Sequence, residues 1–502
     1  MRHDIPQPPG SGIRNALRFG DDAFRFLEGI QARFEDVVEV PIPGRAPLVF
    51  VTSPTLARDV LSRPAEFGRP PATGPARLLA TQGLVQSEGD LWRRQRALMR
   101  PAFVGPRVVA YADTAGDRVA ALADEWRDRL ADREDRDGTD GLRVNLHRET
   151  TTLTIRVASE ILLGEDVGRE RAEQFYEWMQ VAGREFEFGP ESVQPAWLPA
   201  RTSREFREAA AGMRAFAEEL IDRRRTALAD AGGSGGPDRS GAGAGTAGSD
   251  GPGAGAGTAG SDGPTTGDGT GGSAAGEGAD DPPRDMLSLL LRAEAEGVEM
   301  APTQIRDEVM TFLIAGHETT ALSLSFALSL LSWHPEVRTA AREEARRVLG
   351  DATPRHAHVA DLPTVDRVLR ETLRLYPPAW AVFRQATAEV RLGDYRVRRG
   401  SAVVVPLWSI QRDDRYFEAA DEFDPDRWLR RSPSGVEAYL PFSVGPHACI
   451  GQQFAVTGAT LVLAGLVREF DVDVPADGLD DLRATPTLRP GSGVPATVRR
   501  VA

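Results

Sequence analysis

The stretch PFSVGPHACIGQQF, residues 441–454, contains Cys449, the only cysteine among 502 residues. The cysteine stands between Gly445 and Gly451, and His447 precedes it by two positions. Glycine reaches backbone conformations that are closed to other residues, so this loop can bend tightly and approach a flat ligand. A lone cysteine is more often a small buried apolar residue than a ligand. Here the flanking residues favour a ligand.

The loop matches a long and specific family pattern. Phe442, Gly445, His447, Cys449 and Gly451 fit F-x-x-G-x-H/R-x-C-x-G, and the chain therefore resembles the cytochrome P-450 family, the haem-thiolate monooxygenases. A thiolate presented in this way suits a haem iron, and electron donation from sulfur favours O–O cleavage. The resemblance implies that Cys449 is the metal ligand and that Phe442 and Gly451 contact haem b. It covers nearly the whole chain from about residue 35.

Residues 304–333 predict a long helix that is apolar nearly all round, which indicates burial on every side. A membrane span is the rival interpretation, because residues 309–331 are long enough to cross a bilayer. Against it, the middle of the segment reads AGHETT, and a glutamate at the bilayer centre costs about 2.5 kcal/mol or more. We therefore expect a buried central helix and no membrane span. The HETT sequence is not a zinc-protease motif, because Ala321 stands where the second histidine would be.

The AGHETT segment, residues 315–320, resembles the oxygen-binding segment of the family's central helix. Gly316 would let the helix backbone approach the ligand, and hydroxyl side chains can bend a helix by bonding to its carbonyls. The resemblance implies that Thr319 orients a proton relay and that Glu318 feeds it. The alternative is a kinked helix with solvated polar groups.

Two further signatures concern the haem surroundings. Glu371 and Arg374 form an i,i+3 pair that proves nothing alone, but the resemblance makes it a buried structural triad with Arg427. Trp92 and Arg96 are four apart and share one helical face. The resemblance assigns both to the haem propionates, and the side chains with the same implied role are Arg384 and His447. Where the family often has His-Arg-Asp-Pro, this chain has Gln-Arg-Asp-Asp at residues 411–414, which puts one secondary contact on that side in doubt.

The composition excludes several classes of protein. The formal net charge is −14, which disfavours a nucleic-acid binder or a protein that docks on anionic lipid. A single cysteine forms no internal disulfide, and the first 20 residues lack the apolar core of a signal peptide. We expect a cytoplasmic protein.

The predicted fold class is mainly α with small β-sheets, as in the cytochrome P-450 fold, with haem between the long central helix and the cysteine loop. We expect an N-terminal segment at 1–34 and a single haem-thiolate domain at 35–502. Residues 231–280 contain no aliphatic residue larger than alanine or proline and 20 glycines, and predict a disordered insert. Its G-x-G-x-x-G matches are not a dinucleotide site, because no strand precedes them and no helix follows.

No flavin or ferredoxin segment is fused to the chain, so electrons are expected from NAD(P)H through a separate ferredoxin and its reductase. Arg93, Arg94 and Arg100 form a local basic cluster that would suit an acidic ferredoxin, or would simply be a solvated helix face. The expected substrate is hydrophobic: a terpene, a fatty-acyl chain or a polyketide skeleton. By resemblance, its pocket is lined from residues 67–84, 175–199 and 378–383, with Phe312 on the central helix.

Three functions stay open at this point. The leading one is a monooxygenase. We expect it to be a monomer whose partners are ferredoxin and ferredoxin reductase. A peroxygenase or isomerase on the same fold would have little need of the Glu318–Thr319 pair. A non-catalytic haem sensor would need the thiolate and the propionate ligands, but not the relay.

Overall fold

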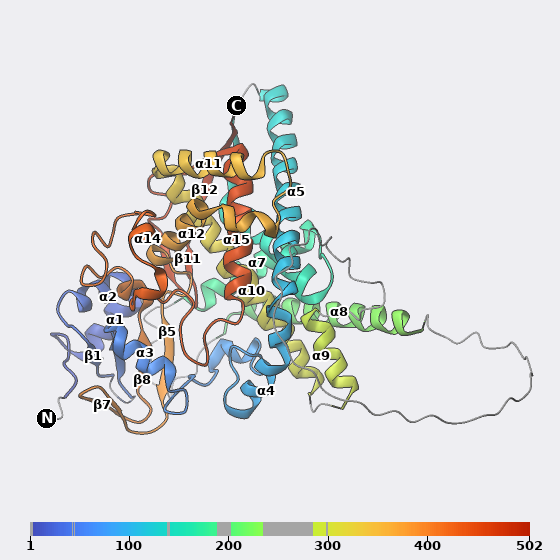
Figure 1. The fold of residues 1–502 in the computed structure, drawn as a ribbon. Helices are drawn as coiled ribbons and strands as arrows, with labels where there is room; N and C mark the ends of the chain where they lie inside the picture. Colours follow the sequence, from blue (N-terminus) through green and yellow to red (C-terminus); the bar gives the residue numbers. More distant parts are fainter. Residues whose placement is uncertain are drawn as a thin grey trace, which may run out of the picture.

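A computed structural model of the chain describes residues 4–42, 44, 46–137, 141–187, 202–233, 285–297 and 300–501. Helices fill most of the molecule, and the largest sheet lies to one side, next to the N-terminal helices (Figure 1). The predicted fold class, mainly α with small sheets, is confirmed. The predicted insert at 231–280 falls outside the described residues except for its first three, which end the helix α8.

The helices are bounded as follows: α1 Gly12–Asp21, α2 Ala23–Gln31, α3 Pro54–Ser62, α4 Gly89–Met99, α5 Pro106–Asp137, α6 Leu146–Ala158, α7 Arg169–Glu185, α8 Arg204–Gly233, α9 Met286–Ala295, α10 Pro302–Trp333, α11 Pro335–Leu349, α12 Pro363–Leu375, α13 Leu407–Ile410, α14 Arg427–Arg430 and α15 Gln452–Glu469. Shorter helical turns are η1 Gly74–Leu78, η2 Arg100–Phe103, η3 Ser159–Leu163, η5 His356–Asp361 and η6 Pro433–Gly435.

The strands form four sheets. The largest has the order β1-β2-β8-β5-β3, in which β2 and β8 run parallel and the other pairs antiparallel. The smaller sheets are β4-β12-β9, β10-β11 and β6-β7. The bounds are β1 Val37–Val40, β2 Leu48–Val51, β3 Phe67–Gly68, β4 Leu142–Asn145, β5 Val382–Ala386, β6 Val390–Leu392, β7 Tyr395–Val397, β8 Ala402–Val405, β9 Phe470–Asp473, β10 Leu482–Ala484, β11 Leu488–Pro490 and β12 Pro495–Arg500.

Helix α10 is the predicted central helix, and its polar residues are buried with satisfied hydroxyls. Ser325 and Ser329 donate to carbonyls one turn back on the same helix, at 2.9 and 2.8 Å. Thr150 on α6 donates to the Ala321 carbonyl at 3.0 Å, and so joins the two helices. Because these groups find partners inside the protein, the helix can be buried without a lipid environment. Within the described ranges, no helix is long and apolar enough to cross a membrane.

Helix α15, which follows the cysteine loop, packs closely against α5. A side-chain carbon at Gly458 would stand 2.5 Å from the Tyr111 ring, and one at Gly465 would stand 3.0 Å from Val119. Both glycines therefore let the helices approach. The N-terminal helices join the same body, because Phe19 and Leu27 are buried in the main core.

The predicted triad is present and fully buried. Arg374 donates to both oxygens of Glu371, at 3.0 and 2.7 Å, and Arg427 Nε donates to Glu371 Oε1 at 3.2 Å. Arg374 also donates to the carbonyls of Gln411, Ala420 and Glu422. The guanidinium therefore holds the irregular chain that leads to the cysteine loop.

Replacing Glu371 by glutamine should destabilise the protein by about 3–5 kcal/mol, because it leaves two buried guanidinium groups without a counterion. Urea unfolding followed by circular dichroism measures this change. The matched control is Asp394→Asn, which breaks the i,i+3 pair of Asp394 with Arg391 on the surface and should cost less than about 1 kcal/mol. Equal losses in the two variants would contradict the structural role of the triad.

Candidate active site

The cysteine loop is closed by its own backbone. The Cys449 amide donates to the Phe442 carbonyl at 3.0 Å, and the Ala448 amide donates to the Gly445 carbonyl at 3.1 Å. Gly445 has φ +78°, and a side-chain carbon there would stand 2.4 Å from the Leu61 carbonyl oxygen. Only glycine fits this position. Ser443, in the same loop, also adopts a positive φ of 59°, which is uncommon for a residue with a side chain.

Gly451 differs from the sequence interpretation. Its φ is −92°, and a side-chain carbon there would make only an ordinary contact, 3.9 Å from the Phe103 ring. The backbone conformation therefore does not require glycine. Gly451 instead caps α15, and its backbone hydrogen bond with Cys449 opposes the burial that raises the pKa of the thiol. The positive charge of Arg96 acts in the same direction as this hydrogen bond.

The cysteine loop and α10 both carry side chains that the protein leaves uncovered, and we call the space beside them the hollow. Cys449 is exposed, although protein atoms surround it closely enough to desolvate it. On α10, Ala315 is exposed and Thr319, one turn later, is partly exposed, whereas most of the helix is buried. The Phe103 ring spans the two elements, because it lies next to Gly451 and stacks on Phe312 at 5.3 Å.

Gly316 does not face this hollow, contrary to its expected role. A side-chain carbon at Gly316 would point at Leu162 and Ala158, at 3.6 and 3.9 Å, on the side where α6 and η3 pack. Ala315 and Thr319 are four residues apart, and they occupy the open face instead.

The two predicted relay residues point to different sides of α10. Thr319 Oγ1 donates to the Ala315 carbonyl at 3.2 Å. Glu318 is buried and accepts a hydrogen bond from Thr487 at 2.9 Å and an ion-paired one from Arg489 Nε. Burial opposes the charge of Glu318, but Arg489 outweighs it and lowers the pKa of the carboxyl below its ordinary value. Glu318 is therefore ionised at neutral pH.

Four predicted side chains come together beside the cysteine loop. The rings of Trp92 and His447 meet edge to face at 4.4 Å, and the Arg96 guanidinium lies 5.7 Å from the Trp92 ring. Burial, together with Arg69, Arg384 and Arg96, lowers the pKa of His447 to about 3. These groups form a basic cage of Arg69, Trp92, Arg96, Arg384 and His447.

The cage has donors without acceptors. Among the residues described, neither Trp92 Nε1 nor His447 Nδ1 has a hydrogen-bond partner, although both atoms are buried. The nearest carboxylate is that of Glu88, whose Oε1 lies 3.8 Å from Arg69 Nε. Buried donors and guanidinium groups in this arrangement fit an anionic ligand, and the two propionates of haem supply the required carboxylates. The residues present therefore fit haem.

Arg69 was missed by the sequence analysis, although it lies within a predicted pocket region. Burial lowers the pKa of Arg69 to about 10, and its neighbours include Arg384 and Arg96. The pairing of Gly68 with Gln385 brings Arg69 next to Arg384. Strand β3 has only two residues, so the sequence shows no alternation that would predict it. Only the FGRP stretch, residues 67–70, could have drawn attention to Arg69.

The departure at Gln411 has a structural role. Its side chain donates to the carbonyls of Leu373 and Arg374, at 2.9 and 3.0 Å, and accepts from the Leu440 amide at 2.8 Å. Gln411 is completely buried. It therefore ties the end of α12 to the start of the cysteine loop.

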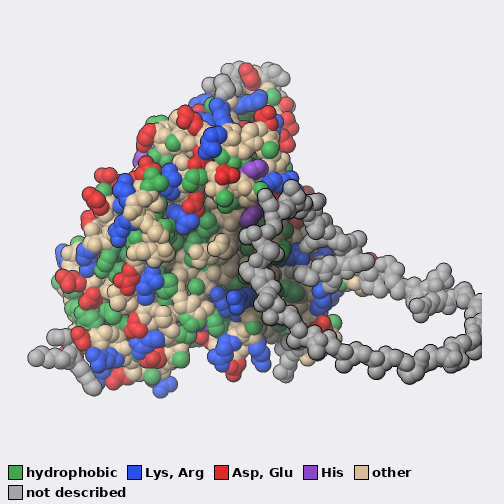
Figure 2. Space-filling view, viewed as in Figure 1, with side chains coloured by type: hydrophobic (Ala, Val, Ile, Leu, Met, Phe, Trp, Pro, Cys, Tyr) green, Lys and Arg blue, Asp and Glu red, His purple; other side chains and the backbone are tan. Residues whose placement is uncertain are grey.

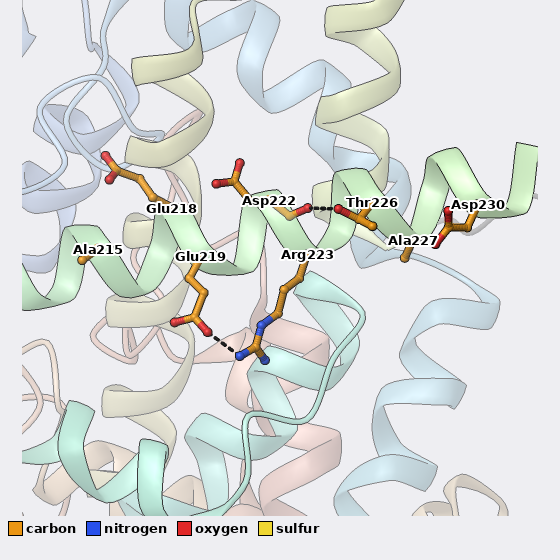
Figure 3. Close-up of a pocket in the computed structure, with 8 residues that line it drawn as sticks. All are labelled: Ala215, Glu218, Glu219, Asp222, Arg223, Thr226, Ala227 and Asp230. Atoms are coloured by element: carbon orange, nitrogen blue, oxygen red, sulfur yellow. Dashed lines mark hydrogen bonds and ion pairs between the residues drawn. The ribbon is translucent and has the colours of Figure 1, made fainter.

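A shallow open groove runs along the outer face of α8, and Figure 3 shows Glu218, Glu219, Asp222, Arg223 and Asp230 along it. Arg223 pairs with Glu219 across one turn of the helix. Charged side chains along one face of a long helix form a solvated surface. None of the predicted site residues lines this groove.

A loop with a single cysteine, a helix with an acid and an alcohol, and a basic cage are the features expected of a haem-thiolate protein. The chain belongs to the cytochrome P450 family, whose model, described as "Cytochrome P450", matches residues 6–492. It is 29% identical to cyclooctatin synthase of Streptomyces melanosporofaciens over 466 residues, which cover 90% of this chain and 86% of the relative.

Two other relatives show the same family likeness. Cyclooctat-9-en-7-ol 5-monooxygenase of the same species is 29% identical over 89% of this chain and 84% of its own length. Pentalenene oxygenase of Streptomyces avermitilis is 38% identical over 39% of this chain and 45% of its own length. The protein is a cytochrome P450 monooxygenase that uses haem and redox partners and acts on a hydrophobic substrate.

Proposed function

We propose that this monooxygenase hydroxylates a terpene skeleton in specialised metabolism. The observation that carries the proposal is the likeness to cyclooctat-9-en-7-ol 5-monooxygenase and cyclooctatin synthase along nearly the whole of all three chains. The surroundings of the hollow agree, because Phe103 and Phe312 are large, apolar and mostly buried. An apolar pocket with few polar groups suits a hydrocarbon. Fatty-acyl and polyketide skeletons are the other substrates that the sequence suggested.

We assign the site residues as follows. Cys449 would ligate the iron of haem b, with Phe442 and Gly451 next to the ring. Trp92, Arg96, Arg384 and His447 would hold the propionates, together with Arg69. When bound, haem supplies the iron at which dioxygen is reduced and from which one oxygen atom is inserted into the substrate.

The protein's own residues would prepare this chemistry in three ways. The apolar rings around the hollow bind the substrate and exclude water. The cage fixes the orientation of the cofactor through its donors. Thr319 and Glu318 would hold the protons that oxygen reduction consumes, Thr319 on the side of the hollow and Glu318 behind it.

Electrons would come from NAD(P)H through a ferredoxin and its reductase, and the protein would act in the cytoplasm as a monomer. The haem-thiolate domain would span residues 35–502. The basic cluster on α4 and the start of η2 supports a ferredoxin site, because Arg93, Arg94 and Arg100 are all exposed. Basic side chains also gather on the lower part of the face in Figure 2, where Figure 1 places α4. Arg93 is paired with the exposed Asp90, which reduces its net contribution.

A panel of cyclic terpene hydrocarbons and their mono-alcohols, medium-chain fatty acids and macrolactones tests the substrate class. We expect the terpenes to bind most tightly in a spectral titration and to give hydroxylated products with a surrogate ferredoxin system. Tighter binding and faster oxidation of a fatty acid or a macrolactone would overturn the proposal.

Cys449→Ser should abolish the red-shifted Soret band of the reduced carbonyl complex, because serine cannot supply the thiolate. The absorption spectrum of the purified variant, normalised to its haem content, measures this band. A variant that keeps the band would remove Cys449 from the ligand position.

Reversing two charges tests the ferredoxin site. Arg93→Glu with Arg100→Glu should slow the first electron transfer from ferredoxin at least tenfold at low salt, because opposed charges mainly raise the association rate. Stopped-flow reduction measures this rate, and added salt should shrink the defect. The control is Arg204→Glu with Arg207→Glu on α8, where Arg204 and Arg207 are also exposed. Equal slowing in both double variants would show a general charge effect and not a docking site.

A further inference from the structure

The carboxylate of Glu318 is fixed from behind α10 by the hairpin of β10 and β11. Glu318 Oε1 accepts from both Thr487 and Arg489, which leaves Oε2 free of these two bonds. Arg489 also donates through Nη1 to the Met179 carbonyl of α7 at 2.6 Å. A side-chain carbon at Gly183 would stand 2.2 Å from that Nη1 atom, so glycine at this position makes room for the guanidinium.

Two buried histidines lie in the same region. His147 on α6 and His317 on α10 are 2% and 1% exposed. Helix α7 covers both, because Tyr176 meets the His147 ring edge to face at 5.6 Å and Phe175 meets His317 at 5.5 Å. His317 Nδ1 is hydrogen-bonded to the Leu313 carbonyl.

Each histidine keeps one buried nitrogen without a protein partner. These atoms are His147 Nδ1 and His317 Nε2, and the hydroxyl of Thr151, one turn after His147, has none either within the described part of the chain. Buried polar groups are normally satisfied, and where protein groups do not reach them ordered water does. The region behind α10 is therefore polar and suited to bound water.

The hollow on the other side of α10 is bordered by the rings of Phe103 and Phe312. Its rings are apolar, and the Thr319 hydroxyl bonds only to a carbonyl of its own helix. A hydrocarbon substrate in the hollow displaces water from that side. A proton supply that works with substrate bound must therefore arrive from behind the helix.

We propose that Arg489 is a positioning residue that holds Glu318 toward the histidine pair, and that protons reach Glu318 through water bound at His147 and His317. This inference rests on the proposed relay role of Glu318. The ionised carboxylate accepts a proton at Glu318 Oε2 and then releases it on the side of Thr319, so the carboxylate is regenerated and the step is a pure proton transfer. His317 Nδ1 donates to the Leu313 carbonyl, which leaves His317 Nε2 as an acceptor that can hold a bound water.

The charges agree with this arrangement. Burial, then Arg489, lowers the pKa of His147 to about 3, and burial lowers that of His317 to about 4. Glu318 acts on both histidines in the opposite direction. Both rings are therefore neutral at pH 7, while the Glu318 carboxylate, paired with Arg489, stays charged. Tyr176 is the titratable group that α7 presents to His147.

Proton delivery is tested in the haem-loaded protein with His147→Leu, Arg489→Met, Arg489→Lys and Glu318→Gln. We expect His147→Leu and Arg489→Met to raise the peroxide released per NAD(P)H and the solvent deuterium isotope effect at least threefold, and Arg489→Lys to restore part of the loss. The control is His334→Gln, at the end of α10, which bonds to the Leu330 carbonyl and should change neither quantity. Substrate affinity should stay within twofold of the parent in all variants.

The variants distinguish the histidine route from the relay role of Glu318. A defect in Glu318→Gln without one in His147→Leu or Arg489→Met would overturn the histidine route and leave the relay role intact. No defect in Glu318→Gln would overturn the relay role itself.

A second measurement does not depend on turnover. In the diamagnetic reduced carbonyl form, nuclear magnetic resonance of ¹⁵N-labelled histidine should show His147 neutral down to pH 5. Arg489→Met should raise the pKa of His147, because it removes a nearby positive charge. A parent His147 that titrates near pH 6.5, or one unaffected by Arg489→Met, would show that the ring is not in this environment.

Discussion

The burial of the Arg374 guanidinium is the interaction on which the rest of the site depends. A charge removed from water must be paired and hydrogen-bonded, and Arg374 meets this need with Glu371 and with three carbonyls of the chain between Gln411 and Glu422. That chain has little regular structure of its own, yet it must deliver Cys449 to a fixed place. Gln411 completes the attachment through the Leu440 amide. The buried ion network thus fixes the chain that leads to the cysteine loop, in the way that backbone hydrogen bonds fix a strand in a sheet.

Helix α10 separates two environments of opposite character. One side faces the hollow with Ala315, Thr319 and aromatic neighbours, where an apolar substrate is expected. The other side carries His317 and Glu318 against α6, α7 and β11, where the Glu318 carboxylate is paired with Arg489 and the His317 ring packs on Phe175. The helix can do both because its hydroxyl groups are bonded to carbonyls, so that its polar residues cost little on burial. Acid and alcohol are adjacent in sequence, but 100° apart around the helix axis, which explains why they do not touch.

Local patterns predicted much of this from the sequence. The cysteine motif, the all-round apolar helix and the Glu371–Arg374 pair lie in short continuous stretches, and their periodicity or spacing carries the information. The errors concern direction: Gly316 faces α6 and η3, and Gly451 has ordinary backbone angles. The omissions are long-range contacts. Arg69 reaches the cage through the pairing of β3 with β5, and Arg489 reaches Glu318 from 171 positions away. The residues next to Arg69 or Arg489 in the sequence do not indicate these distant partners.

The hairpin of β10 and β11 belongs to two systems at once. Thr487 and Arg489 bind Glu318, the proposed relay acid. The neighbouring Thr485 carbonyl accepts from Trp380 at 2.6 Å, and the Leu488 amide donates to the Pro378 carbonyl at 2.7 Å, in the segment expected to line the pocket. A change here that reshapes the pocket also displaces the carboxylate. Mutations in this hairpin are therefore expected to change two properties together: which substrate is bound, and what fraction of the electrons is used to form product. In directed evolution toward a new substrate, changes in residues 67–84, which are also expected to line the pocket, would leave this hairpin and the Glu318 carboxylate intact.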